Sequence, residues 1–174
     1  MDKVQLIQQL RLHHKNFTDT VEAFQQEQFE YNATQKWNAG QQLDHIYKSI
    51  SPVQLAFILP HFILKIMFGK ANRTSKTYDE VITKYKSKLA LGGSASGRFL
   101  PKKIKFEERA KLSNKILTTT ESLCNAINNK TEEELDTYIL PHPLLGKLTL
   151  REMIYFTIYH VQHHHKQVEE NITQ

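Results

Sequence analysis

Four histidines near the end of the chain carry the clearest chemistry in this sequence: His160, His163, His164 and His165. His160 and His164 are four residues apart, so in a helix their imidazole rings lie one above the other on one face. Two imidazoles at this spacing can bind one metal ion. The side chains of a single helix do not complete a tetrahedral site, so a third ligand must come from another part of the chain.

Two further interpretations of this cluster stay open from the spacing alone. His163 lies three residues after His160, which also places its ring on that side of the helix. The cluster could equally be a polar group at a helix end, where positive charge interacts favourably with the last carbonyl groups. His165 is expected to point away from the others, into solvent.

One helix should hold all four histidines. Thr149 and Glu152 have the Thr-x-x-Glu spacing of a capping box, which marks the start of a helix. From that start, residues 149–173 are expected to form about six to seven helical turns.

The remaining chain shows the apolar periodicity of helices and no alternating strand pattern of useful length. Further helices are expected over residues 3–30, 38–50, 77–89, 106–128 and 131–138. They predict an all-α fold, most simply a four-helix bundle with one long crossover connection and additional short helices. The whole chain, residues 1–174, is expected to form a single domain.

Two prolines punctuate the most apolar part of the chain, residues 53–68. Ser51 and Pro52 have the order of a helix cap and a first helical position, so a new helix is expected there. Pro60 removes a backbone donor and should bend or break that helix. The segment is apolar nearly all round, beyond what one bundle face needs, and this predicts a homodimer.

The connections and the isolated side chains receive simpler interpretations. Residues 91–101 contain three glycines and two serines and are expected to form a crossover loop. His13 and His14 have no second histidine at ligand spacing, so a surface or edge position is expected for both. Cys124 is expected to be a small core residue of the helix over residues 106–128.

Bundles build metal sites from side chains on facing helices, so the third ligand should lie on a neighbour of the last helix. The helix over residues 38–50 offers two donors, Asp44 and His45. The spacing of residues along this helix does not show which of the two is the ligand.

The positions of these histidines resemble those of a known family. Trp37 is followed eight residues later by His45, and the chain ends with His160-x-x-x-His164, with His163 just before the second member. This combination resembles the DinB-like (DNA-damage-inducible) superfamily, which includes the bacillithiol- and mycothiol-dependent S-transferases.

A second stretch, residues 142–152, is similar to a DinB-like subgroup found among bacterial proteins. The resemblance covers essentially the whole chain and implies a four-helix bundle with a three-histidine divalent metal site, often in a homodimer. Carried over to this sequence, it implies His45, His160 and His164 as the ligands, and it favours His164 over His163.

Three neutral imidazoles leave at least one coordination position of the ion open, as in catalytic rather than closed structural sites. An open divalent ion can lower the pKa of bound water towards about 7 or hold a thiol as thiolate. We therefore expect a thiol S-transferase or a hydrolase. The alternative is a non-catalytic metal-binding or stress-response module.

The metal and the groups around it are less constrained. All-imidazole ligation suits zinc, nickel, copper or iron and does not choose among them. We expect zinc or nickel, with iron, copper or manganese as alternatives. Candidates to orient the rings, chosen by sequence proximity, are Asp44, Gln162, His163 and Gln167. The expected partners are a small-molecule thiol and an electrophilic substrate.

The composition excludes several other classes of protein. The chain has 174 residues, of which 40% are hydrophobic and 24% charged, an ordinary globular composition. The single cysteine excludes an internal disulfide. The N-terminal residues lack the apolar run of a signal peptide, and residues 53–68 are too short and too polar to span a bilayer. We expect a cytoplasmic protein with no membrane segment.

The net charge of +5 is partly local. Residues 98–115 hold seven basic and two acidic residues, which we interpret as a solvated helix face and the loop that leads into it. This segment shows no recognition helix and no RNA-binding signature, so nucleic acid is not an expected partner.

Overall fold

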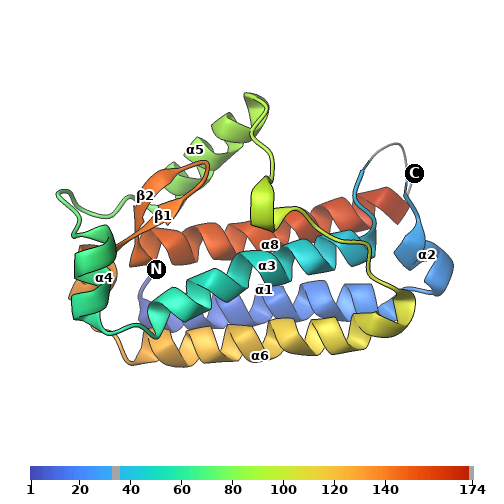
Figure 1. The fold of residues 1–174 in the computed structure, drawn as a ribbon, viewed down its shortest axis with the longest axis horizontal. Coiled ribbons are helices and arrows are strands. Elements are labelled where there is room, and N and C mark those ends of the chain that lie inside the picture. Colours follow the sequence, from blue (N-terminus) through green and yellow to red (C-terminus); the bar gives the residue numbers. More distant parts are fainter. Residues whose placement is uncertain (33–35, 173–174) are drawn as a thin grey trace.

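Four long helices lie side by side in the computed structural model, which describes residues 1–32 and 36–172 (Figure 1). They are α1 (Lys3–Ala23), α3 (Ala39–Phe57), α6 (Arg109–Asn128) and α8 (Leu150–Ile172). Each contacts two neighbours, in the order α1, α6, α3, α8 and back to α1. The prediction of an all-α fold is confirmed.

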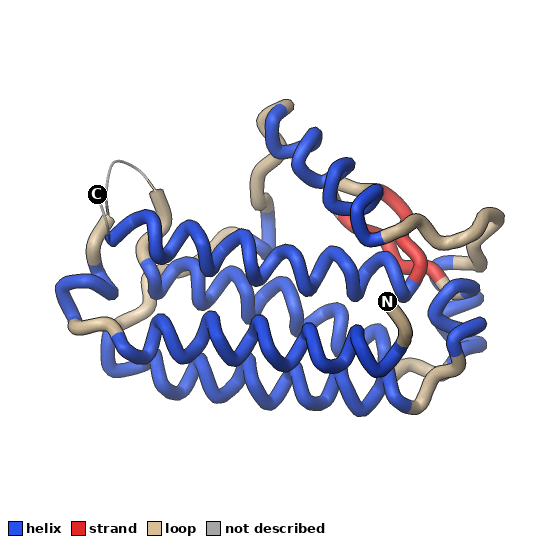
Figure 2. The backbone as a smooth tube through the Cα atoms, turned by 180° about the vertical axis from the view of Figure 1, so that it is seen from behind, coloured by secondary structure: helices blue, strands red, loops and turns tan. Residues whose placement is uncertain are grey.

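A long crossover follows from the directions of these helices. α1 and α8 run one way along the bundle, and α3 and α6 run the other way (Figures 1 and 2). The chain must therefore return along the bundle between the end of α3 and the start of α6. This return contains α4 (His61–Phe68), α5 (Tyr78–Ala90) and the short 3-10 turns η1 (Gly97–Phe99) and η2 (Phe106–Glu108).

The helix starts follow the capping residues read from the sequence. The Asn38 side chain accepts a hydrogen bond from the backbone N–H of Gln41 at 2.9 Å, which begins α3. At the start of α8, the backbone N–H of Glu152 donates to Thr149 Oγ1 at 3.2 Å, and that of Thr149 donates to Glu152 Oε2 at 3.0 Å. These bonds satisfy backbone donors that would otherwise lack partners, and they fix where each site-bearing helix begins.

The first helix is shorter than predicted. α1 ends at Ala23, and a separate short helix, α2 (Gln26–Glu30), follows an extended residue, Phe24. Phe24 and Phe29 are both buried, and the Phe29 ring meets the Phe106 ring edge-on at 5.7 Å. The change of direction lets both phenylalanines reach the core at the same end of the bundle.

The prediction of a new helix at Ser51 and Pro52 is wrong, whereas the break at Pro60 is confirmed. α3 continues through Pro52 to Phe57, because the buried side chains of Ile50, Val53 and Phe57 hold it against the core. Their packing offsets the cost of about 3 kcal/mol that proline imposes inside a helix. At Pro60 the chain turns by 114° between α3 and α4.

A small hairpin before α8 was not predicted. β1 (Ile139–His142) and β2 (Gly146–Thr149) pair antiparallel, with Ile139 opposite Thr149 and His142 opposite Gly146. Gly146 has a φ of 78°, a conformation that favours glycine at the end of the turn. Strands of four residues, one of them containing a proline, are too short to show alternation in the sequence.

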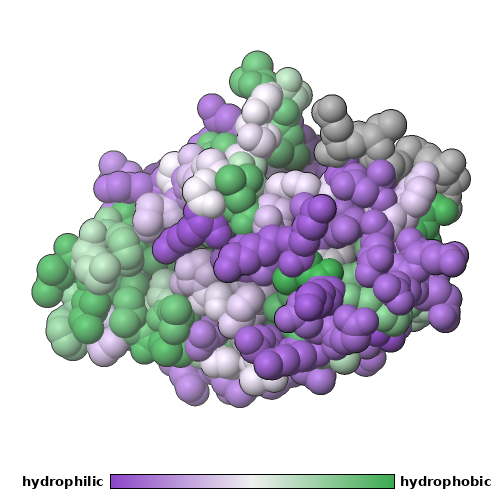
Figure 3. All heavy atoms as spheres, turned by 45° about the vertical axis from the view of Figure 1, so that its right-hand side comes forward, coloured by the Kyte–Doolittle hydropathy of each residue, from purple (hydrophilic) through white to green (hydrophobic). Residues whose placement is uncertain are grey.

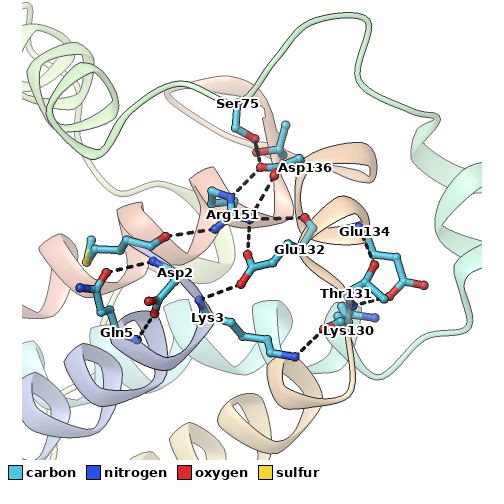
Figure 4. A network of polar contacts seen from close by, with 12 residues as sticks. Asp2, Lys3, Gln5, Ser75, Lys130, Thr131, Glu132, Glu134, Asp136 and Arg151 are labelled. Carbon is cyan, nitrogen blue, oxygen red and sulfur yellow. Dashed lines mark hydrogen bonds and ion pairs between the residues drawn. The ribbon is translucent and has the colours of Figure 1, made fainter.

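A network of charged groups anchors the start of α8 (Figure 4). The Arg151 guanidinium donates to Asp136 Oδ1 at 2.6 Å and to Glu132 Oε2 at 2.6 Å, and both acceptors belong to α7 (Glu132–Thr137). It also donates to the backbone oxygen of Met1 at 3.1 Å. Arg151 thus joins the beginning of α8 to α7 and to the N-terminus.

No helix in the described part of the chain is by itself long and apolar enough to cross a membrane. Within residues 1–32 and 36–172, only α3 and α4 taken together, across their bend, have that length and composition.

Candidate metal centre

Three histidine rings from two facing helices meet in the bundle. His45 comes from α3, and His160 and His164 come from adjacent turns of α8. His160 Nε2 lies 3.2 Å from His45 Nε2 and 3.0 Å from His164 Nε2. A tetrahedral ion with bonds of 2.0–2.1 Å separates its ligand nitrogens by about 3.3 Å, so this spacing fits a single ion. The described residues bring together these three histidines as a group that could hold a metal ion.

Hydrogen bonds on the far side of two rings decide which nitrogen carries the proton. His45 Nδ1 donates to the backbone oxygen of Phe99 at 2.8 Å, and His164 Nδ1 donates to the side-chain oxygen of Gln42 in a short bond. A carbonyl oxygen can only accept, so the proton of each ring lies on Nδ1. Nε2 of each ring then has a free lone pair, as a metal ligand requires.

The three rings are held neutral by their surroundings. Burial lowers the pKa of His45, and it lowers the pKa of His160 and His164 well below the usual value, with the neighbouring histidines acting in the same direction. Three neutral rings therefore meet in one small volume at pH 7, and those of His45 and His164 point lone pairs into it. In the absence of a cation His160 Nε2–H can donate to one of these lone pairs, and a cation there would be coordinated by all three rings with His160 in the tautomer protonated on Nδ1.

Aromatic side chains fix the orientation of the rings. The Trp37 ring is stacked on that of His164 with centroids 6.2 Å apart and lies 4.9 Å from that of His45. On the other side, the Phe156 ring is stacked on that of His160 at 4.8 Å. These contacts restrict ring rotation, so the three nitrogens keep their convergence.

The His45 ring, rather than the Asp44 carboxylate, reaches the histidines of α8. Asp44 Oδ2 accepts from the backbone N–H of Lys102 at 2.7 Å and forms an ion pair with Lys48 at 2.6 Å. Asp44 therefore ties α3 to the crossover, and its effect on His45 is a through-space charge rather than a hydrogen bond.

Gln167 and His163 lie next to the three rings. Gln167 Nε2 hydrogen-bonds His163 Nε2 at 3.1 Å, and Gln167 Oε1 accepts from Gln42 Nε2 at 3.2 Å. Gln167 also hydrogen-bonds the His164 side chain, which Gln42 holds as well. Gln162, also named from proximity, hydrogen-bonds Tyr78 instead.

The partners that hold the rings were missed in the sequence. Gln42 lies three residues before His45, and this helical spacing could have indicated it. The backbone oxygen of Phe99 is 54 residues away from His45 and leaves no trace in side-chain chemistry.

The other histidines lie elsewhere, and two differ from expectation. His14 is buried and donates from Nδ1 to the backbone oxygen of Leu10 at 2.8 Å, so the expected surface position is wrong. His165 points towards α1, where it hydrogen-bonds Thr20 at 2.8 Å, and its side chain is only 20% exposed rather than fully solvated. Cys124 is buried, as predicted, and burial raises the pKa of its thiol to about 12.

A cavity of about 820 Å³ opens beside the three rings. His45, His160 and His164 line it, together with residues of α5, the hairpin and the segment around η1. Tyr85 of α5 also lines it, and burial raises the pKa of its phenol to about 12. The cavity gives a small molecule access to the point on which the three nitrogens converge.

Comparison with known proteins identifies the kind of chain that carries this site. The sequence model of the DinB superfamily matches residues 9–168, a span that includes all three histidines. No curated protein sequence matches the chain.

Proposed function

We propose that this chain, which belongs to the DinB superfamily, binds a divalent metal ion through His45, His160 and His164. The observation that carries the proposal is the convergence of Nε2 atoms whose rings are neutral. Hydrogen bonds to Phe99 and Gln42 place the protons of two of these rings on the opposite nitrogen. The proposed ion is zinc or nickel, both of which imidazole ligands suit, with iron, copper or manganese as alternatives.

We further propose that the site is catalytic and not purely structural. Closed structural sites use four protein ligands, whereas this group offers three and faces a cavity large enough for a substrate. When bound, a divalent ion would lower the pKa of a thiol or a water molecule that coordinates it. The resemblance to thiol S-transferases favours a low-molecular-weight thiol that attacks an electrophile; hydrolysis by water is the second form of this proposal.

The chain's own residues would then orient and shield the reacting groups. Gln42 and the backbone oxygen of Phe99 hold two rings in the ligating tautomer. Trp37 and Phe156 cover the rings and exclude water from their faces. Tyr85, whose phenol keeps its proton at neutral pH, supplies a hydrogen-bond donor to the cavity.

Metal binding is tested by elemental analysis of the purified protein and of single alanine variants. His45→Ala and His160→Ala should lose the ion, whereas His165→Ala, which removes a neighbouring histidine bonded to α1, should keep it. The single tryptophan stacks on His164, so its fluorescence should change when the metal-free protein is titrated with Ni²⁺. Equal metal content in all variants would refute the site.

Catalysis is tested by thiol consumption with a panel of electrophiles, measured with the protein as purified and after chelation. Metal-dependent loss of thiol with any electrophile supports the transferase. Metal-dependent release of product without thiol supports the hydrolase. If the protein binds metal but turns over no member of the panel, this result supports the alternative, a non-catalytic metal-binding or stress-response module.

The proposal includes a homodimer through the end of the bundle at α4. Five large apolar side chains there are more than half exposed: Leu55, Ile58, Phe62, Ile66 and Met67. Figure 3 shows hydrophobic residues gathered over this end of the molecule. Light scattering at micromolar concentration should give the mass of a dimer, and Ile66→Asp should give a monomer. A monomeric parent protein would contradict the dimer.

A further inference from the structure

The cavity follows the line along which α3 and α8 pack antiparallel, and its composition changes along that line. At one end Gln42 of α3 meets Gln167 of α8 through a hydrogen bond of 3.2 Å. One turn further along α3, His45 meets His160. All four line the cavity, so this part of it is polar.

Beyond the three histidines the cavity becomes mainly apolar, and a further histidine in this part of its lining, His142 of β1, is neutral because burial lowers its pKa to about 4. Val53 and Ala56 of α3 face Met153 of α8 there, and Phe68 of α4 and Leu140 of β1 close the end. Leu89 and Leu144 add further apolar wall from α5 and the hairpin turn. Eleven residues of α3 separate His45 from Ala56, which corresponds to about 16 Å at the rise of an α-helix. The cavity is therefore long enough for an extended chain that runs from the histidines to the apolar end.

Formal charge lies only on the polar side of this cavity among its described lining residues. Lys36 precedes the tryptophan that stacks on the histidine rings, and Arg98 precedes the residue whose carbonyl holds His45. Glu170 lies near the end of α8, beyond Gln167. No lysine, arginine, aspartate or glutamate lines the stretch from Val53 to Leu140 in the described structure, so a charged group placed there would have no counter-charge.

We propose that the natural ligand is an amphipathic molecule with an uncharged alkyl chain, whose polar head lies at the three histidines and whose chain lies between Val53, Ala56 and Met153. The position of the head rests on the proposed metal function, whereas the position of the chain rests on the apolar walls alone. The chain gains affinity because each methylene leaves water for an apolar surface, which corresponds to about a fourfold increase per methylene.

Straight-chain alkyl hydroxamic acids of increasing length test this proposal, because the head group binds metal ions while only the chain varies. Their dissociation constants are measured by calorimetry with zinc-loaded protein and with protein treated with a chelator. We expect affinity to rise about fourfold per methylene in both forms, and then to level off once the chain fills the apolar part.

Comparison of the zinc-loaded with the chelator-treated protein shows whether the proposal for the alkyl chain or the proposal for the metal is wrong. Affinity that increases with zinc but does not depend on chain length would overturn the chain proposal and leave the metal function standing. Affinity that rises with chain length but is no higher with zinc than without it at any length would support the chain proposal while counting against the metal as the head-group site. Affinity that depends neither on chain length nor on zinc would overturn the chain proposal and count against the metal as the head-group site.

Two substitutions locate the chain within the cavity. Ala56→Phe fills the apolar end and should weaken the longest hydroxamate at least tenfold while leaving the shortest unchanged. Ala90→Phe is the matched control, because Ala90 of α5 is exposed and is not part of the cavity. Phe68→Ala should act in the opposite direction and move the levelling-off to a longer chain.

Helical circular dichroism and metal content, measured for each variant, establish that it is folded. If Ala56→Phe weakens short and long hydroxamates equally, or if Ala90→Phe reproduces its effect, the chain does not occupy this end of the cavity. If Ala56→Phe does not fold, the shift expected for Phe68→Ala decides the matter.

Discussion

Helix α8 contributes buried side chains to two polar clusters that are neutralised in different ways. At its start, Arg151 meets Asp136 and Glu132, and Glu152 accepts from the Arg73 guanidinium at 2.8 Å. Every charge in this first cluster faces a charge of opposite sign. In the middle of the helix, His160 and His164 face a third neutral ring, and His160 Nε2 lies within 3.2 Å of the Nε2 atoms of the other two rings, with no charged partner among them.

The contrast separates a structural cluster from a binding site. Pairs of opposite charge satisfy each other and hold elements together, as Arg151 holds α7 and the N-terminus (Figure 4). The His45 and His164 rings both present acceptors, and His160 can offer them only one proton, so all three rings are satisfied only by something from outside the chain. The second arrangement costs stability, and its presence in the core is explained by the ligand that it can bind.

The largest expected effect is at the start of α8. Glu152→Ala removes the partner of Arg73 and the acceptor for the backbone N–H groups of Thr149 and Lys76. Because the Glu152 side chain is fully buried, the variant should lower the free energy of unfolding by about 3 kcal/mol. Urea denaturation measures this. Metal content per folded chain should stay unchanged, and its loss would break the separation between the two clusters.

A smaller effect, on metal affinity instead of stability, is expected at the residues that hold the histidine rings. Gln42→Leu removes the acceptor that holds His164 Nδ1, so metal affinity should fall about 10- to 100-fold. Gln42→Glu keeps an acceptor oxygen and should keep most of the affinity. Competition with a chromogenic chelator measures both variants. Unchanged affinity in Gln42→Leu would show that this hydrogen bond does not orient the ligand.

Acid should act on buried histidines and on the carboxylate pairs in different pH ranges. Burial lowers the pKa of His14 to about 4, below its value in the unfolded chain. The unfolded state then binds the proton more readily, so the stability that neutral His14 contributes is complete above about pH 6.5 and is lost as the pH falls towards 4. By pH 5.5 the loss should reach about 1 kcal/mol in urea denaturation.

His14→Leu should remove this part of the pH dependence. Burial alone would raise the pKa of Glu152, but hydrogen bonds from Arg73 and two backbone N–H groups lower it below its usual value. Stability from Glu152 is therefore complete above its unfolded pKa and is lost only in more acidic solution, as the pH falls through its folded pKa. A profile for His14→Leu as steep as that of the parent protein between pH 7 and 5.5 would contradict the assignment.

The smallest effect should come from an exposed ion pair that belongs to neither cluster. Arg11 and Glu121 join α1 to α6 at 2.5 Å, but both side chains are about half exposed. Water and salt screen this pair, so Glu121→Gln should cost at most about 0.5 kcal/mol, and less at high salt. A cost as large as that of Glu152→Ala would show that burial does not explain the difference between these pairs.

The parts of this molecule that could be predicted from sequence are those with local signals. The helical spacing of His160 and His164, the capping pair Thr149 and Glu152, and the break at Pro60 depend only on nearby residues, and the structure shows each of them. The choice of His45 as third partner came from resemblance to a family, since spacing alone allowed Asp44 equally.

The parts that could not be predicted depend on contacts between distant segments. Packing of Ile50 and Val53 carries α3 through Pro52, against the local preference of proline. The carbonyl of Phe99 reaches His45 because the crossover lies over α3, and a backbone oxygen has no residue-specific signature. His14 is buried because of its place between neighbouring helices rather than because of its residue type.

X-ray absorption spectroscopy of the metal-loaded protein tests the central claim most directly, since it counts the ligands of the ion. The geometry predicts imidazole scattering from three rings with metal–nitrogen distances of about 2.0–2.1 Å for zinc, and no sulfur ligand from the buried Cys124. The His160→Ala protein should lose this spectrum. A spectrum with one or no imidazole, or one that His160→Ala leaves unchanged, would contradict the three-histidine site.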